Sequence, residues 1–210
     1  MLKLYIVRHG ETEWNKVQRI QGRLNSNLTD KGRHYAGLLG EKLKDTEFTG
    51  IISSPSERAL ETAQLIRGTR TTPIKTDERI MEMHLGHWQG LTTKEIKEQY
   101  PEEYDSYMNQ PDIYLNGDGE SFTDMLNRAN EFLRELKNSE MTGNLLIVTH
   151  GLFIKILYLI FKGIELKDLW TESTVNGTSL SIVKLEHGRF ELMVEGDMSH
   201  VKEKDSTVIY

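Results

Sequence analysis

Short runs of apolar residues, each followed by small or polar residues, dominate the pattern of this 210-residue chain. Three such runs occupy residues 4–7, 50–53 and 145–148, and each contains the β-branched residue Ile. Runs of this length predict strands that are covered on both faces. Helical patterns follow the second and third runs, and this alternation predicts an α/β fold with a mostly parallel sheet.

Helices are predicted from apolar positions three or four residues apart and from capping residues at their starts. Ser54 is expected to cap a helix, with Glu57 completing a capping box. Thr29 and Ser121 are expected to begin two further helices. The apolar stretch 152–161 predicts a buried helix, since it is too short to cross a membrane.

The C-terminal part of the chain changes the expected sheet from parallel to mixed. Residues 179–185 and 190–194 flank the turn 186–189, which predicts a hairpin.

Residues 98–120 hold tyrosines among acidic residues with weak periodicity, so we expect an irregular, cap-like excursion over one end of the sheet. Without a linker or an internal repeat, residues 1–210 are expected to form a single domain.

The composition, with 37% hydrophobic and 28% charged residues, is that of a soluble globular protein. A net charge of −6 argues against a nucleic-acid-binding protein, which carries a basic excess. The absence of cysteine excludes disulfides, thiolate metal sites and cysteine nucleophiles. The N-terminal apolar run is too short for a signal peptide, and no stretch reaches the ~20 apolar residues of a membrane span. We therefore expect a cytoplasmic protein with no membrane association.

Cationic and imidazole side chains follow all three predicted strands. Arg8 and His9 come directly after the first strand, Arg58 lies in the helix after the second, and His150 follows the third. Ligands of open α/β sheets bind outside the carboxyl ends of the strands. Guanidinium groups match phosphate oxygens, and helix N-termini add backbone N–H donors. One Arg-His-Gly is a weak signal, but repetition at three strand ends predicts a phosphate site.

Motifs over nearly the whole length resemble those of the histidine phosphatase superfamily, which includes the cofactor-dependent phosphoglycerate mutases. They are RHGETEWN at 8–15, QG at 21–22, LTDKG at 28–32, SSPSERALETA at 53–63, E-x-x-x-G-x-W-x-G at 82–90, GES at 119–121 and THG at 149–151. The combination is highly specific, although each part alone is not. The resemblance implies a phosphoglycerate mutase-like fold, a three-layer α/β/α sandwich with a central mixed, mostly parallel sheet.

The resemblance also implies roles for individual residues of this sequence. His9 stands at the position of the family's phospho-acceptor, and Glu82 at the position of its proton donor. The residues at the positions of the phosphate pocket are Arg8, Arg58 and His150. The residues in the loops that contact the bound anion are Asn15, Gln21, Gly22 and Gly151.

This chemistry places demands on the two central groups. His9 must attack phosphorus through a neutral ring nitrogen, so its other nitrogen is expected to meet a backbone carbonyl. Glu82 would protonate the leaving alkoxide, although Glu78 in the same charged stretch is almost as good a candidate on the residues alone. No metal or cofactor is expected, because the arginines supply the positive charge. His84 and His87 could ligate a metal, but two histidines without a third ligand are a weak site.

The predicted function is that of a histidine acid-type phosphatase, a hydrolase acting on small-molecule phosphomonoesters through a phosphohistidine. A phosphoglycerate mutase is the alternative, but the resembling mutases carry basic residues after the proton donor. No Lys, Arg or His lies between Lys97 and Arg128. A non-catalytic phospho-ligand binding module is a third possibility, against which the complete residue set argues.

The tyrosines of residues 98–120 allow two interpretations. They can pack against an apolar or aromatic leaving group, or they can simply pack the cap onto the core. The sequence leaves this choice open, together with the physiological substrate and the oligomeric state.

Overall fold

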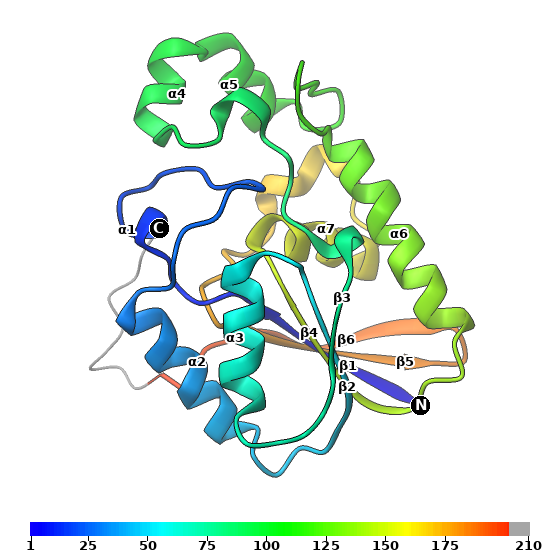
Figure 1. Ribbon diagram of the computed structural model, residues 1–210. Coiled ribbons are helices and arrows are strands. Elements are labelled where there is room, and N and C mark those ends of the chain that lie inside the picture. The colour runs from blue at the N-terminus through cyan, green and yellow to red at the C-terminus, as the bar shows by residue number, and fades with distance from the viewer. Residues whose placement is uncertain (202–210) are drawn as a thin grey trace.

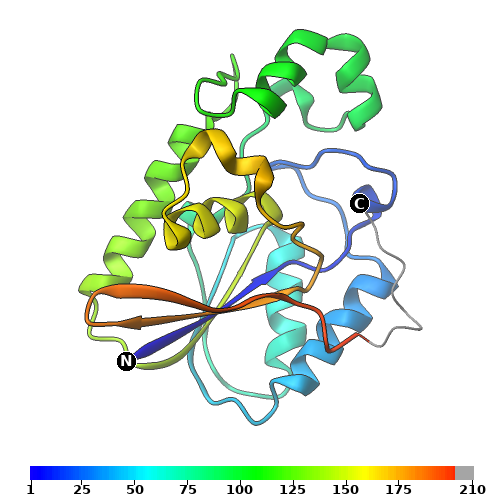
Figure 2. The same cartoon turned by 180° about the vertical axis from the view of Figure 1, so that it is seen from behind.

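A six-stranded mixed sheet lies at the centre of the computed structural model, which describes residues 1–201 (Figures 1 and 2). The strands are β1 (Leu2–Arg8), β2 (Phe48–Ser53), β3 (Ile74–Thr76), β4 (Gly143–Thr149), β5 (Leu180–Glu186) and β6 (Arg189–Asp197). Their order is β3-β2-β4-β1-β5-β6. The pairs among β3, β2, β4 and β1 are parallel, whereas β5 pairs antiparallel with both β1 and β6. The predicted mixed, mostly parallel sheet and its C-terminal hairpin are confirmed.

Helices cover both faces of the sheet, as the two views show (Figures 1 and 2). Val7 of β1 packs into an apolar cluster with residues of α2 and α3, whereas Leu4 and Ile6 pack into a second cluster with residues of α6 and α7. Burial of each such side chain contributes about 1.5–3 kcal/mol. The predicted three-layer sandwich is therefore confirmed. The covering helices are α2 (Asp30–Lys42), α3 (Glu57–Arg67), α6 (Phe122–Asn138) and α7 (Gly151–Lys162).

Smaller helical elements complete the described part of the chain. They are α1 (Glu13–Lys16), α4 (Thr93–Gln99), α5 (Pro101–Asn109) and the 3₁₀ helices η1 (Glu78–Ile80), η2 (Gly86–Trp88) and η3 (Leu166–Thr171). Within residues 1–201 no helix has the length and apolar character needed to cross a membrane.

Two of the predicted helix starts are confirmed by their hydrogen bonds. The hydroxyl of Thr29 accepts from the Gly32 amide at 2.9 Å at the start of α2. The hydroxyl of Ser121 accepts from the Asp124 amide at 3.1 Å at the start of α6, and the Asp124 carboxylate completes a capping box.

The predicted start of the helix after β2 was wrong by two residues. α3 begins at Glu57, with Ser56 as its N-cap and no capping bond from a side chain. The Ser54 amide instead donates to the Val148 carbonyl at 2.9 Å, so sheet pairing with β4 extends through this residue. The Ser54 hydroxyl oxygen lies 2.8 Å from Nε2 of His150. Ser54 therefore belongs to the end of the sheet rather than to the helix.

The excursion at residues 98–120 is less irregular than predicted. It contains the end of α4 and all of α5, and Figure 1 shows these helices at the end of the molecule opposite the N-terminus. The rings of Tyr104, Tyr107 and Tyr114 surround the buried Trp88, with centroid distances of 6.1, 5.2 and 6.0 Å. These contacts show that the tyrosines pack α5 and the following loop onto the core. We call residues 93–120 the cap.

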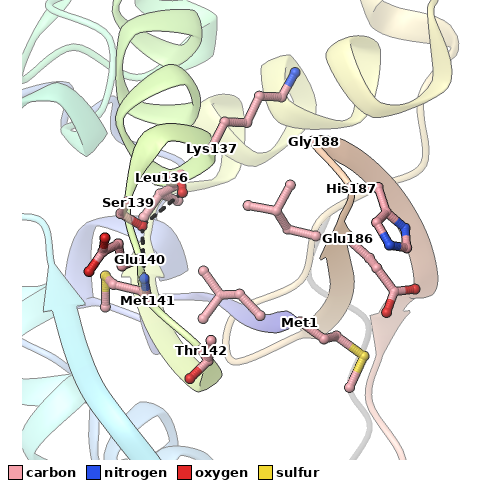
Figure 3. A pocket seen from close by; sticks show the side chains of 12 residues that line it. Met1, Leu136, Lys137, Ser139, Glu140, Met141, Thr142, Glu186, His187 and Gly188 are labelled. Atoms are coloured by element: carbon pink, nitrogen blue, oxygen red, sulfur yellow. Dashed lines mark hydrogen bonds between the residues drawn. The ribbon is translucent and has the colours of Figure 1, made fainter.

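A surface hollow lies at the other end of the sheet, where β1 begins (Figure 3). Its lining includes Met1, Leu136, Met141 and His187. The candidate phosphate-binding residues follow the carboxyl ends of the strands, so this hollow is not part of their site.

His87 joins three segments at the base of the cap. Its Nδ1 lies 2.9 Å from Oδ1 of Asp118, and its Nε2 lies 3.0 Å from Oε2 of Glu103 on α5. The ring centroid is 4.5 Å from that of Tyr100. The hydrogen bond to Asp118, followed by the charge of Glu103, raises the pKa of His87 above its ordinary value.

We expect the cap to be attached less firmly at alkaline pH. Because the folded-state pKa of His87 is raised, its stabilising contribution is complete below the unfolded-state pKa of about 6.5. That contribution is lost as pH rises through the higher folded-state pKa. The difference in melting temperature between the native protein and His87→Gln should shrink from about pH 6 to about pH 9. His34→Gln, at an exposed position, is the control, and a difference independent of pH would contradict the expectation.

Candidate active site

Two neighbouring strands and one helix bring four of the predicted site residues together. Arg8 is the last residue of β1, His9 follows it, and His150 follows the adjacent parallel strand β4. The rings of His9 and His150 lie with their centroids 5.2 Å apart and their planes inclined by 62°. Arg58, from the first turn of α3, donates through Nη2 to Nδ1 of His150 at 3.2 Å. Residues far apart in the sequence thus form one cluster at the carboxyl ends of the strands.

His9 is held as a neutral imidazole with one nitrogen free to react. Its Nδ1–H donates to the Gly10 carbonyl at 2.8 Å, so the lone pair lies on Nε2. The expected backbone acceptor is therefore the carbonyl of the next residue. Burial lowers the pKa of His9 well below its ordinary value, and the charges of Arg58 and Arg8 lower it further. A neutral ring with a fixed tautomer is the state that a nucleophilic histidine needs.

The turn after His9 depends on close contact between two backbones. A Cβ atom on Gly10 would lie 2.8 Å from the Gly32 carbonyl oxygen, so a larger residue would displace the start of α2. The Gly10 amide donates to the Thr62 hydroxyl at 3.0 Å. These contacts fix the carbonyl that orients the His9 ring.

The guanidinium groups of Arg8 and Arg58 retain unused hydrogen-bond donors. Arg58 donates through Nη2 to the Gly22 carbonyl at 2.7 Å, and Arg8 donates through Nη1 to the Val175 carbonyl at 2.6 Å. The Nε–H of each arginine is buried and has no acceptor among residues 1–201. Buried donors normally have partners, so these two indicate that a ligand oxygen completes the site.

The charge of the two arginines points to the same conclusion. Burial lowers the pKa of Arg8, and it lowers the pKa of Arg58 to about 10, so Arg58 remains protonated near neutral pH. Guanidinium groups do not lose their proton in proteins, so Arg8 is charged as well. Buried positive charge is costly unless an anion shares the site. Guanidinium groups bind phosphate oxygens in pairs of parallel hydrogen bonds. The cluster is therefore suited to an oxyanion such as phosphate.

Glu82 faces this cluster from the segment between η1 and η2. Its Oε2 accepts from the Leu152 amide at 3.3 Å at the N-terminus of α7, and its Oε1 accepts from the Met83 amide at 3.1 Å. Its negative charge opposes the lowering of the pKa of Arg58. Glu78, in contrast, is exposed in η1. The structure therefore places Glu82, and not Glu78, beside the arginines.

His150 carries no charge in this arrangement. Its Nδ1 accepts from Arg58, so Nε2–H donates to the Ser54 hydroxyl. Burial lowers the pKa of His150 well below its ordinary value, and the Arg58 charge adds to the effect. Sequence reasoning missed Ser54 as a site residue, although its place at the carboxyl end of β2 was a usable signal.

The remaining predicted residues occupy different positions around the cluster. A Cβ atom on Gly151 would lie 3.2 Å from Nε of Arg8, so this glycine lets the start of α7 pack closely against the guanidinium. Gln21 is 7% exposed, and its Oε1 has no hydrogen-bond partner among residues 1–201. Asn15 instead completes a capping box with Thr12, whose amide and hydroxyl both donate to its Oδ1. Gly22 and Gly151 thus contact the arginines, whereas Asn15 supports the loop.

The two histidines that follow Glu82 do not form a metal site in the described part of the chain. Both ring nitrogens of His87 are engaged by carboxylates. Residues 1–201 contain no group of three or more His, Asp or Glu side chains arranged to hold a metal ion.

Comparison with known proteins agrees with this geometry. The sequence profile of the histidine phosphatase superfamily (branch 1) matches residues 4–197, and the chain belongs to this superfamily. Phosphoserine phosphatase 1 of Hydrogenobacter thermophilus is 32% identical over 189 residues, which cover 90% of this chain and 89% of the relative. A metal-independent phosphoserine phosphatase of Arabidopsis thaliana is 30% identical over 203 residues, covering 95% of this chain and 83% of the relative.

Solved structures show the same fold. YhfR of Bacillus stearothermophilus superposes with a TM-score of 0.92 at 42% identity, covering 96% of this chain and 100% of that protein. A phosphoglycerate mutase of Bacillus anthracis superposes with a TM-score of 0.81 at 25% identity, covering 95% and 94%. The expected phosphoglycerate mutase-like fold is confirmed, and phosphatases are among the relatives of this chain.

We expect Arg58→Met to raise the pKa of His9, because it removes a positive charge that disfavours the imidazolium. The variant should also bind inorganic phosphate about 10–100-fold more weakly, since charged hydrogen bonds are worth about 1.5–3 kcal/mol. NMR titration of the His9 ring and calorimetry with phosphate would measure both effects. Arg67→Met, in the last turn of the same helix, is the control. An unchanged His9 titration would show that Arg58 does not act on this ring.

Proposed function

We propose that this chain is a metal-independent phosphomonoester phosphatase that acts on small phosphorylated metabolites through a phosphohistidine at His9. The observation that supports this most strongly is the neutral His9 ring, whose free Nε2 lies beside Arg8 and Arg58, each with a buried Nε–H that has no acceptor among residues 1–201. The relatives named as phosphoserine phosphatases support the reaction class.

In the first half-reaction, Nε2 of His9 attacks the phosphorus and the bond to the ester oxygen breaks. The transferring group carries its negative charge on three equatorial oxygens, to which Arg8 and Arg58 can donate. Each preorganised donor of this kind is worth about 3–4 kcal/mol. Glu82 gives its proton to the leaving alkoxide, so the alcohol departs neutral and the carboxylate remains.

In the second half-reaction, water attacks the phosphorus and the bond to Nε2 of His9 breaks. The Glu82 carboxylate takes a proton from the water, which restores its acid form. The ring nitrogen recovers its lone pair while Nδ1–H stays bonded to the Gly10 carbonyl. Inorganic phosphate then leaves the arginines, and the enzyme returns to its first state.

Metal independence rests on the same positive groups. Arg8 and Arg58 provide the charge that a bound cation provides in other phosphotransferases. One relative carries metal independence in its name. For a mutase the cap would need cations that hold a second anionic group, yet α5 and the loop that follows it contain none.

We expect His9→Ala to lose at least about 10³-fold in the release of inorganic phosphate from p-nitrophenyl phosphate and from a panel of metabolites. EDTA should leave the native rate unchanged. The native enzyme should also accumulate an acid-labile phosphoryl label that is absent from His9→Ala. His34→Ala, a histidine in an exposed position of α2, is the control.

Other outcomes would replace the proposal. Interconversion of phosphoglycerates that depends on bisphosphoglycerate would favour a mutase. Binding of phosphate without turnover of any phosphomonoester would favour a binding module. Equal activity of His9→Ala and the native protein would rule out the phosphohistidine.

A further inference from the structure

We propose that the buried ion pair of Arg128 and Glu120 is the positioning device for Glu82 and controls proton transfer to the leaving group. This inference rests on the proposed function of Glu82 as the acid. The pair includes the glutamate of the GES motif at 119–121, to which the mechanism assigns no step.

The ion pair has the geometry of a rigid fork. Nε of Arg128 lies 2.6 Å from Oε1 of Glu120, and Nη2 lies 3.0 Å from Oε2. The two side chains are only 12% and 10% exposed. Two parallel charged hydrogen bonds fix the orientation of both groups.

Arg128 binds the backbone that precedes Glu82, and Glu120 binds the backbone that follows it. Nη1 of Arg128 donates to the carbonyls of Arg79 and Met81 at 2.6 and 2.7 Å. Oε2 of Glu120 accepts from the His84 amide at 3.1 Å, and the Glu120 amide donates to the His84 carbonyl at 2.7 Å. The segment that carries Glu82 is therefore fastened immediately before and shortly after this residue.

The glycine of the GES motif fits this arrangement. A Cβ atom on Gly119 would lie 2.4 Å from the His84 carbonyl oxygen. Only glycine lets the 116–120 loop approach closely enough for Glu120 to bond both backbone groups of His84.

Arg128 also links the segment that carries Glu82 to α7. Its guanidinium carbon lies 5.1 Å from the centroid of Phe153, which directly follows Leu152. The Leu152 amide in turn donates to Oε2 of Glu82. The same side chain therefore contacts the segment that bears the carboxyl group and the helix whose N-terminus receives it.

The position of the Glu82 carboxylate depends on this backbone, since within residues 1–201 both of its hydrogen bonds come from main-chain amides. A shift of about 1 Å in a reacting group can cost about 10²-fold in rate. A buried ion pair contributes little net stability compared with apolar residues of similar size. The presence of this pair in the structure is therefore better explained by positioning than by stability.

The test separates substrates by their need for a proton. The alcohol part of an alkyl phosphate such as phosphoserine leaves as an alkoxide that must be protonated. The p-nitrophenolate group of p-nitrophenyl phosphate departs without a proton. In Arg128→Met and Glu120→Gln, kcat/KM for the alkyl phosphate should fall about 10²-fold. The value for p-nitrophenyl phosphate should change less than about threefold. Arg134→Met, exposed on the same helix, is the control.

A double-mutant cycle distinguishes positioning from general support of the fold. Glu82→Gln alone should show the same selective loss, and adding Arg128→Met should cost little more, because the acid is already absent. If either single variant fails to fold, Arg128→Met with Glu120→Met keeps the site apolar and filled. Equal losses on both substrates, additive losses in the cycle, or no loss at all would overturn the proposal.

A second readout does not require activity. Amide hydrogen exchange at Met83 and Leu152, whose N–H groups donate to Glu82, should become faster in Arg128→Met. Unchanged exchange would overturn the positioning role. If the native protein hydrolyses no phosphomonoester, the proposed function fails, and the exchange measurement still decides the role of the ion pair.

Discussion

Two positive guanidinium groups beside a buried, neutral imidazole are the constraint on which the rest of this site depends. Burial keeps His9 unprotonated, and the charges of Arg58 and Arg8 add to this effect while they leave positive charge beside the ring. An incoming oxyanion relieves this cost and meets the reactive nitrogen in one step. Gly10, Gly151 and the alignment of β1 with β4 all serve to keep these groups close together.

The strand ends made much of the site predictable from the sequence. Arg8 and His9 directly follow one apolar run, and His150 follows another after Thr149. The rule that parallel strands end at one edge of the sheet is enough to group these residues. Ser54 was misassigned because its capping signal competed with sheet pairing, which depends on a partner strand almost a hundred residues away. The hydrogen bonds of Asn15 and the link between Arg128 and Glu82 also depend on tertiary contacts that no local pattern reveals.

The cap shows a different limit of sequence reasoning. Tyr100, Tyr104 and Tyr107 follow the helical spacing of three and four residues, but α5 contains no Leu, Ile or Val to reveal a helical face. Tyr104, Tyr107 and Tyr114 pack around Trp88. Burial raises the pKa of Tyr107, and the nearby charge of Glu82 raises it further. One aromatic side chain can thus both hold the cap and border the leaving-group side of the site.

The place of β1 in the sheet has a consequence for how the protein is made. This first strand lies between β4 and β5, which are encoded more than 130 positions later. During synthesis it has no hydrogen-bonding neighbour until most of the polypeptide has left the ribosome, so the centre of the sheet closes last. A nascent chain interrupted before β4 therefore presents an apolar, unpaired strand, the kind of segment that chaperones must shield from aggregation.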